Sequence, residues 1–239
     1  MAGLLIFVES IRWLGLRWGY RSVQAGMRAA GFQDECIPWK WHSSRRGWLV
    51  LPATMNRTLI EQESQRLSQF IVERRATQPA EPLHLIGYSF GGYIALRALE
   101  FLPDDIRVDS AALLAAAFSP RRDLTKACRA VTKTLVIASS MGDAAIIGGG
   151  TLLFGAADGS HAFSVGMVGT RWRGSPKLHR IPWRPRMIRL GNFGGHFTAT
   201  ARGFVQHCIA PAMQIAGEFN CAAGAGTTRP GRPDPTAPR

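Results

Sequence analysis

Ser89, in the sequence GYSFGG (residues 87–92), is the residue whose type and surroundings are best suited to chemistry. The apolar run LHLI precedes this segment, and the helix-like run YIALRAL follows it. Where a strand turns sharply into a helix, the spacing G-x-S-x-G projects the serine hydroxyl above the sheet. The small flanking residues let the strand and the helix pack closely around it. The pattern therefore predicts that Ser89 is a nucleophile on a tight bend.

This motif, with its apolar strand and following helix, resembles the α/β-hydrolase superfamily, particularly its lipase and esterase branch. The resemblance covers Leu4 to about Ile215 and rests on the strand order and the serine turn rather than on continuous similarity. It implies a catalytic triad whose members occur in the chain order serine, acid, histidine. It also implies an oxyanion hole made of two backbone N–H groups.

One histidine and one aspartate suit the remaining triad positions best. His196, in RLGNFGGHFTAT, follows the expected last strand, where the family carries its catalytic histidine. Asp143 lies just beyond the apolar run TLVIAS and is the preferred acid. Asp158, in an Asp-Gly turn, is the alternative, and Asp123 is expected to be a surface charge. His196 would act as general base towards Ser89, and the acid would orient its imidazole.

The oxyanion hole is the point at which this sequence departs from the family. One N–H is expected from Phe90, the residue after the nucleophile. The other should come from the loop FVESIRWLG after the first strand, with Ile11 as the best candidate. The family commonly has His-Gly or a glycine-rich run here, whereas this chain has Glu9 and Ser10. The departure leaves a non-catalytic binding protein on the same scaffold as an open alternative.

The preferred function is that of a serine hydrolase that cleaves carboxylic esters, like lipases and carboxylesterases, through an acyl-enzyme intermediate. A thioesterase or an acyltransferase with the same triad is the second alternative. No cofactor and no metal are expected for this chemistry. The substrate is expected to be a small-molecule or lipid ester.

The elements that must position these residues alternate along the chain. Short apolar runs predict strands, and the segments between them predict helices, so the fold class is α/β. We expect a doubly wound, mostly parallel six-stranded sheet with helices on both faces. The strands are predicted at residues 4–8, 35–39, 83–87, 110–116, 134–139 and 186–190, and the helices at 20–30, 57–75, 93–102 and 197–215.

Residues 1–221 are predicted to form one α/β-hydrolase domain. Residues 222–239, rich in glycine, proline and threonine, are expected to be a disordered tail. The segment 117–133 between two strands is too short for a helical cap domain, which favours an open site. The later segment 144–185 either packs on the sheet or forms a wall of the substrate site.

Net charge and cysteine usage restrict the partners and the compartment. The chain carries a net charge of +13, with four lysines and twenty-five widely spread arginines. The densest basic stretch, Arg171 to Arg189, has seven basic residues and no acid, so a weak contact with an anionic surface is a further expectation. No nucleic-acid-binding motif accompanies it, and nucleic acid is not expected as a partner. Free thiols and the absence of a recognisable signal predict a cytoplasmic protein.

Overall fold

A computed structural model describes residues 3–10, 19–41, 56–145, 157–159 and 163–215. Its centre is a six-stranded sheet in the order β2-β1-β3-β4-β5-β6, in which every neighbouring pair is parallel. This arrangement confirms the predicted fold class. The strands are β1 (Leu4–Val8), β2 (Glu35–Trp39), β3 (Leu83–Tyr88), β4 (Val108–Leu114), β5 (Val131–Ser139) and β6 (Leu178–Pro182).

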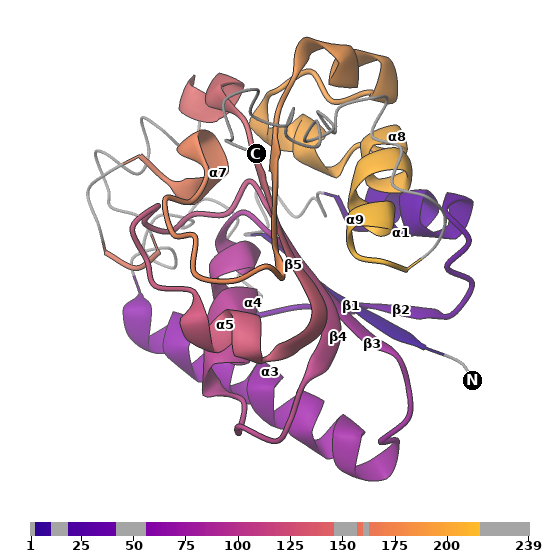
Figure 1. Ribbon diagram of the computed structural model, residues 1–239, viewed down its shortest axis with the longest axis vertical. Helices are drawn as coiled ribbons and strands as arrows, with labels where there is room; N and C mark the ends of the chain where they lie inside the picture. The colour runs from indigo at the N-terminus through magenta and orange to yellow at the C-terminus, as the bar shows by residue number, and fades with distance from the viewer. Residues whose placement is uncertain (1–2, 11–18, 42–55, 146–156, 160–162, 216–239) are drawn as a thin grey trace, which may run out of the picture.

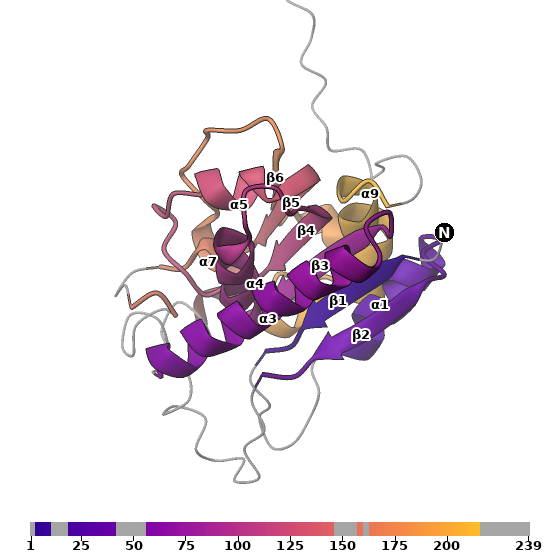
Figure 2. The same cartoon turned by 90° about the horizontal axis from the view of Figure 1, so that it is seen from below.

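Helices cover both faces of this sheet (Figures 1 and 2). Alternate residues of a strand point to opposite faces, so β1 contributes to two separate cores. Leu4, Ile6 and Val8 pack in the core beneath α3 (Arg57–Thr77), α4 (Phe90–Phe101) and α5 (Thr125–Arg129). Leu5 and Phe7 pack in the core beneath α1 (Tyr20–Ala29) and the C-terminal helices.

The sheet explains why the central strands are almost wholly apolar. All residues of β1 and β3 are buried, as expected for a parallel sheet that is covered on both faces. The two edge strands are different, because β2 and β6 are largely half-buried or exposed. The order of elements brings the carboxyl ends of all six strands to one edge of the sheet, where loops from distant parts of the chain can meet.

The predicted last strand at residues 186–190 is wrong. These residues form the short helix η2 (Pro185–Leu190), and the sixth strand is β6, at Leu178–Pro182. Pro185, at the start of η2, has the fixed φ angle that suits a helical turn. The real strand is paired on one side only, and four of its five residues are not buried, so it lacks the apolar run by which the others were recognised.

The predicted helix at residues 197–215 is also wrong as one continuous element. It is divided into η3 (His196–Thr200) and a helical run made of α8 (Arg202–Phe204), η4 (Val205–Ile209) and α9 (Ala210–Ala212). Ala201 separates the two parts, because its ψ angle of 135° is extended. The π-helical segment η4 precedes Pro211, whose missing N–H cannot bond the carbonyl of His207. The remaining boundaries agree to within three residues: α4 begins at Phe90 rather than Tyr93, β5 begins at Val131 rather than Thr134, and β4 lies two residues earlier than predicted.

The expectation of free thiols holds for two of the four cysteines. Cys36 and Cys128 are free, and burial raises the pKa of the Cys36 thiol to about 11. Cys208 is disulfide-bonded, which corrects the expectation for this residue. Its partner lies outside the described residues, as does the predicted tail, 222–239. Among the helices that the structure describes, none is long and apolar enough to cross a membrane.

Candidate active site

Ser89 lies between β3 and α4, with φ at 57° and ψ at −124°. A non-glycine residue at positive φ is strained, at a cost of about 1–3 kcal/mol, and persists only where its surroundings hold it. Backbone hydrogen bonds do so here. The Ser89 N–H donates to the Leu114 carbonyl at 2.9 Å, and the Ser89 carbonyl accepts from the N–H groups of Gly92 and Ala117 at 2.9 and 3.3 Å. The bend is thus tied to the end of β4.

The glycines around Ser89 allow close packing that a side chain would prevent. A Cβ on Gly91 would overlap the carbonyl oxygens of Val8 and Glu9 at the end of β1. A Cβ on Gly87 would lie 2.7 Å from the Cβ of Ala95, one turn into α4. Neither obstacle is the flexible end of a side chain. The G-x-S-x-G spacing therefore has the packing role in this chain that the sequence predicted.

Ser89, His196 and Asp143, the three residues predicted to form the triad, form a continuous hydrogen-bonded chain. The Nε2 of His196 lies 3.0 Å from the Ser89 Oγ, and its Nδ1 lies 3.0 Å from the Oδ2 of Asp143. With the proton on Nδ1, the imidazole donates to the carboxylate and accepts from the serine hydroxyl. All three residues are buried. The contacts join positions 107 and 53 residues apart in sequence.

A polar scaffold holds the loops that carry His196 and Asp143. The Ser140 hydroxyl donates to the Gly194 carbonyl, and its backbone carbonyl accepts from the Asp143 N–H at 3.1 Å. On the other side, the Asn192 side-chain oxygen accepts from the Gly194 N–H at 3.0 Å. Sequence reasoning missed both supporting residues. Ser140 gave a weak signal as a polar residue directly after a strand and three positions before the acid.

Tyr88 contacts His196 through both its hydroxyl group and its ring. Its hydroxyl donates to the His196 carbonyl at 3.2 Å, and the two rings lie with their centroids 5.1 Å apart. Burial, with a smaller contribution from the Asp143 charge, raises the pKa of Tyr88 far above its usual value. The phenol therefore stays protonated and keeps its role as a donor.

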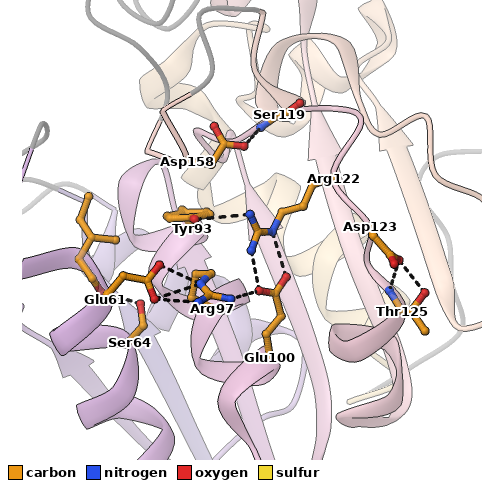
Figure 3. Close-up of polar contacts among 11 residues, drawn as sticks. Glu61, Ser64, Tyr93, Arg97, Glu100, Ser119, Arg122, Asp123, Thr125 and Asp158 are labelled. Carbon is orange, nitrogen blue, oxygen red and sulfur yellow. Dashed lines mark hydrogen bonds and ion pairs between the residues drawn. The ribbon is translucent and has the colours of Figure 1, made fainter. Parts of the chain in front are cut away.

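The other two candidate acids, Asp158 and Asp123, form hydrogen bonds with residues other than His196, as Figure 3 shows. The Asp158 carboxylate accepts from the backbone N–H of Ser119 at 2.7 Å, which ties down the loop after β4. Asp123 accepts from both the backbone N–H and the hydroxyl of Thr125 at the start of α5. Asp143, not Asp158, is therefore the aspartate whose carboxylate contacts His196.

The other histidines of the described chain do not approach Ser89 in a comparable way. His84 is buried in β3, where its Nδ1 lies 2.8 Å from the hydroxyl of Ser110 on β4. His179 and His207 are exposed. His42 and His161 lie outside the described residues.

One of the two predicted oxyanion donors can be examined. Phe90 is the first residue of α4, and a backbone N–H in the first turn of a helix has no acceptor within the helix. The helix dipole adds partial positive charge at this end. Ile11 lies outside the described residues, which include the preceding Glu9 and Ser10. The carbonyl of buried Glu9 accepts from the Trp41 indole at 2.6 Å, which ties the exit from β1 to the segment after β2. Gly91, in the first turn of α4, packs against the same carbonyl.

Within the described part of the chain, no group of three or more histidine, cysteine, aspartate or glutamate side chains could hold a metal ion. The arrangement that remains is a serine hydroxyl, an imidazole and a carboxylate in line, with backbone N–H groups at a helix N-terminus. It can transfer the serine proton to the imidazole and stabilise negative charge on an oxygen that lies next to the serine.

The chain matches no protein-family model and no curated protein. Similar solved structures include a serine hydrolase without a lid from Xanthomonas campestris (17% identity, covering 85% of this chain and 79% of that chain, TM-score 0.43). A lipase-esterase related protein from Clostridium acetobutylicum is also similar (14% identity, 84% and 90% covered, TM-score 0.42). A third is a cutinase-like protein from Cryptococcus sp. (13% identity, 90% and 96% covered, TM-score 0.43).

The first of these is described as a member of the α/β serine hydrolases. Identities of 13–17% and TM-scores of 0.42–0.43 do not support a family or an activity for this chain. The case for an activity must come from the geometry of this chain's own residues.

Proposed function

We propose that this protein is a serine hydrolase that cleaves carboxylic esters. The observation that carries the proposal is the hydrogen-bonded chain from Ser89 Oγ through the His196 imidazole to the Asp143 carboxylate, with 3.0 Å at each step. The serine sits on a strained bend at the N-terminus of α4, where a nucleophile and an oxyanion donor are adjacent.

In the first half of the reaction, the Ser89 oxygen attacks the ester carbonyl carbon while His196 Nε2 takes the hydroxyl proton. The carbonyl oxygen becomes an oxyanion, which accepts a hydrogen bond from the Phe90 N–H. Asp143 stabilises the imidazolium through Nδ1. When the tetrahedral intermediate collapses, the bond to the alcohol breaks, and His196 returns the proton to the departing alkoxide. The acyl group remains on Ser89.

In the second half, water attacks the acyl carbon and gives its proton to His196. Collapse of the second intermediate releases the carboxylic acid and restores the Ser89 hydroxyl with the proton from His196. Ile11 is retained in the proposal as the second oxyanion donor. A thioester or an alcohol acceptor would use the same steps, with a thiol as leaving group or an alcohol in place of water.

Labelling with a fluorophosphonate probe tests this proposal directly, because the probe reacts with activated serines. We expect strong labelling of the wild type and none of Ser89→Ala. His196→Ala should lower the labelling rate about 10³-fold or more. Asp143→Asn should lower it by about 10²–10⁴-fold, because the amide favours the wrong tautomer.

The matched control for the acid is Asp158→Asn, which changes the same group in the other candidate. It should label at a rate close to that of the wild type. Absence of labelling in folded wild-type protein would overturn the proposal and favour a binding function. If the wild type is labelled, hydrolysis of p-nitrophenyl esters of increasing chain length, with and without an alcohol acceptor, would identify the preferred acyl chain and the acceptor.

A further inference from the structure

The arginines of this protein fall into two sets. Several arginines on α3 and α4 and after β4 form ion pairs, among them Arg74 with Glu81, Arg97 with Glu61 and Arg122 with Glu100. Four arginines in the segment around β6 and η2 differ from these. Arg171, Arg173, Arg184 and Arg189 are exposed, and none of the four forms an ion pair within the described chain.

The chain near these arginines lacks acids altogether. From residue 163 to residue 215 the sequence contains no aspartate and no glutamate. No acid within this segment therefore offsets the charges of Arg171, Arg173, Arg184 and Arg189. Uncompensated surface charge attracts an anionic partner.

Large apolar side chains are exposed in the same region. Met141 and Phe193 have 65% and 66% of their surface accessible, and Ile188, Val168 and Phe197 are also exposed. They belong to segments around the candidate active site, since Met141 begins the helix that contains Asp143 and Phe197 follows His196. Clustered exposed apolar residues typically mark an interaction surface.

Contacts between the segments bring these side chains to one end of the molecule. The backbone of Gly142 packs against the Gly194 carbonyl, so the neighbours Met141 and Phe193 come from adjoining loops. The Asn192 N–H donates to the carbonyl of Met187 at 3.1 Å, which joins η2 to the histidine loop. Helix α7 (Val165–Val168) contacts η1 (Met141–Ala145), which places Val168 in the same group of segments.

We propose that these residues form a surface that docks on an anionic lipid layer. We call it the basic apolar rim, and define it as Met141, Val168, Ile188, Phe193 and Phe197 with Arg184 and Arg189. The apolar side chains would enter the layer while the arginines contact its anionic headgroups. The apolar members argue for lipid rather than nucleic acid, whose backbone would need only the arginines.

This inference rests on the proposed function and deepens it. Phe197 lies against the His196 ring and Met141 begins the helix that contains Asp143, so docking through the rim would bring the candidate triad to an ester held in the layer. Binding to lipid itself requires no catalysis. It can therefore be measured with Ser89→Ala, and failure of the rim and failure of the catalytic proposal remain distinguishable.

The experiment is sedimentation of the full chain with vesicles of phosphatidylcholine alone or mixed with phosphatidylglycerol. We expect Ser89→Ala protein to bind the mixed vesicles and not the neutral ones. Arg184→Gln with Arg189→Gln should weaken binding to the mixed vesicles about tenfold. The matched control is Arg107→Gln with Arg129→Gln, which removes the same charge from exposed positions. Both residues lie just before β4 and β5, at the amino ends of these strands and away from the carboxyl ends near the candidate site. This control should weaken binding less than twofold.

A second variant separates docking from general charge attraction. Met141→Ser with Phe193→Ser leaves the net charge unchanged and alters only exposed side chains, so the fold should be retained. We expect it also to weaken vesicle binding about tenfold. Three outcomes would each overturn the proposal. The first is an equal loss of vesicle binding in the two double arginine variants, and the second is unchanged binding of the Met141→Ser/Phe193→Ser variant. The third is no binding of the Ser89→Ala parent to the mixed vesicles. Tighter binding to a single-stranded DNA probe than to vesicles would instead favour a nucleic-acid partner.

Discussion

The Ser140 hydroxyl donates a hydrogen bond to the Gly194 carbonyl at 2.5 Å, joining the loop of the candidate acid to the loop of the candidate base across 54 residues of sequence. Within the residues that the structure describes, no hydrogen bond inside a strand ladder or a helix makes this connection. The distance between Asp143 and His196 therefore depends on a side chain that does not itself contact Ser89.

Replacing Ser140 by alanine should reduce kcat about fivefold with little change in KM, because losing a neutral hydrogen bond costs about 1 kcal/mol. Steady-state hydrolysis of a p-nitrophenyl ester measures both constants. Ser140→Thr retains the hydroxyl and should recover most of kcat. Ser139→Ala, which removes a hydroxyl from the preceding residue, is the control. Equal losses in the two alanine variants would contradict a positioning role for Ser140.

Gly91→Ala should disrupt the serine bend, because the added Cβ meets the backbone of Val8 and Glu9. Overpacking of this kind costs about 1–3 kcal/mol. We expect a lower Tm together with loss of fluorophosphonate labelling. Gly195→Ala is the matched control beside the histidine: nothing lies within 4 Å of its Cβ position, and its φ is −84°. Comparable damage from both substitutions would contradict this account of Gly91.

The free energy of unfolding should fall as the pH falls from about 6.5 to about 4. Burial lowers the pKa of His84 from 6.5 to about 4. The positive charges of Lys133 and Arg75 lower it further, and the negative charges of Asp109 and Asp34 partly oppose the shift. Between these values the unfolded chain binds a proton that the folded chain does not, so stability rises with pH across this window. The full contribution is about 3 kcal/mol.

Urea unfolding at several pH values checks this dependence. His84→Asn removes the titrating group while leaving a polar partner for Ser110, and its unfolding free energy should vary less across the same window. Parallel curves for the variant and the wild type would show that another group is responsible.

Arg97→Met should lower the free energy of unfolding by about 2 kcal/mol, because it breaks a partly buried network between α3 and α4. The Arg97 guanidinium contacts both carboxylate oxygens of Glu61, and also Glu100, which Arg122 contacts in turn (Figure 3). Arg66→Met, at an exposed arginine paired with Glu63, should cost less than about 1 kcal/mol. Chemical denaturation of both variants makes the comparison, and similar losses would contradict a special role for the network.

The sequence alone determined the serine bend and the buried central strands. Ser89 and its glycines are neighbours in the chain, and β1 and β3 are short, almost wholly apolar runs, so the local pattern was sufficient. Asp143 and His196 were selected by their positions after expected strands and by the family resemblance. The structure brings them into contact with each other and with Ser89, and the catalytic role of the three stays a prediction.

The tertiary structure decided what local pattern could not express. An edge strand pairs on one side and buries little, so β6 left no apolar run to recognise, and η2 was taken for it. The choice between Asp143 and Asp158 depended on which loop meets His196, and that is a matter of packing at the carboxyl edge of the sheet. The hydrogen bond from Ser140 to Gly194 likewise joins segments far apart in sequence, because a hydrogen bond depends on distance in space and not on separation along the chain.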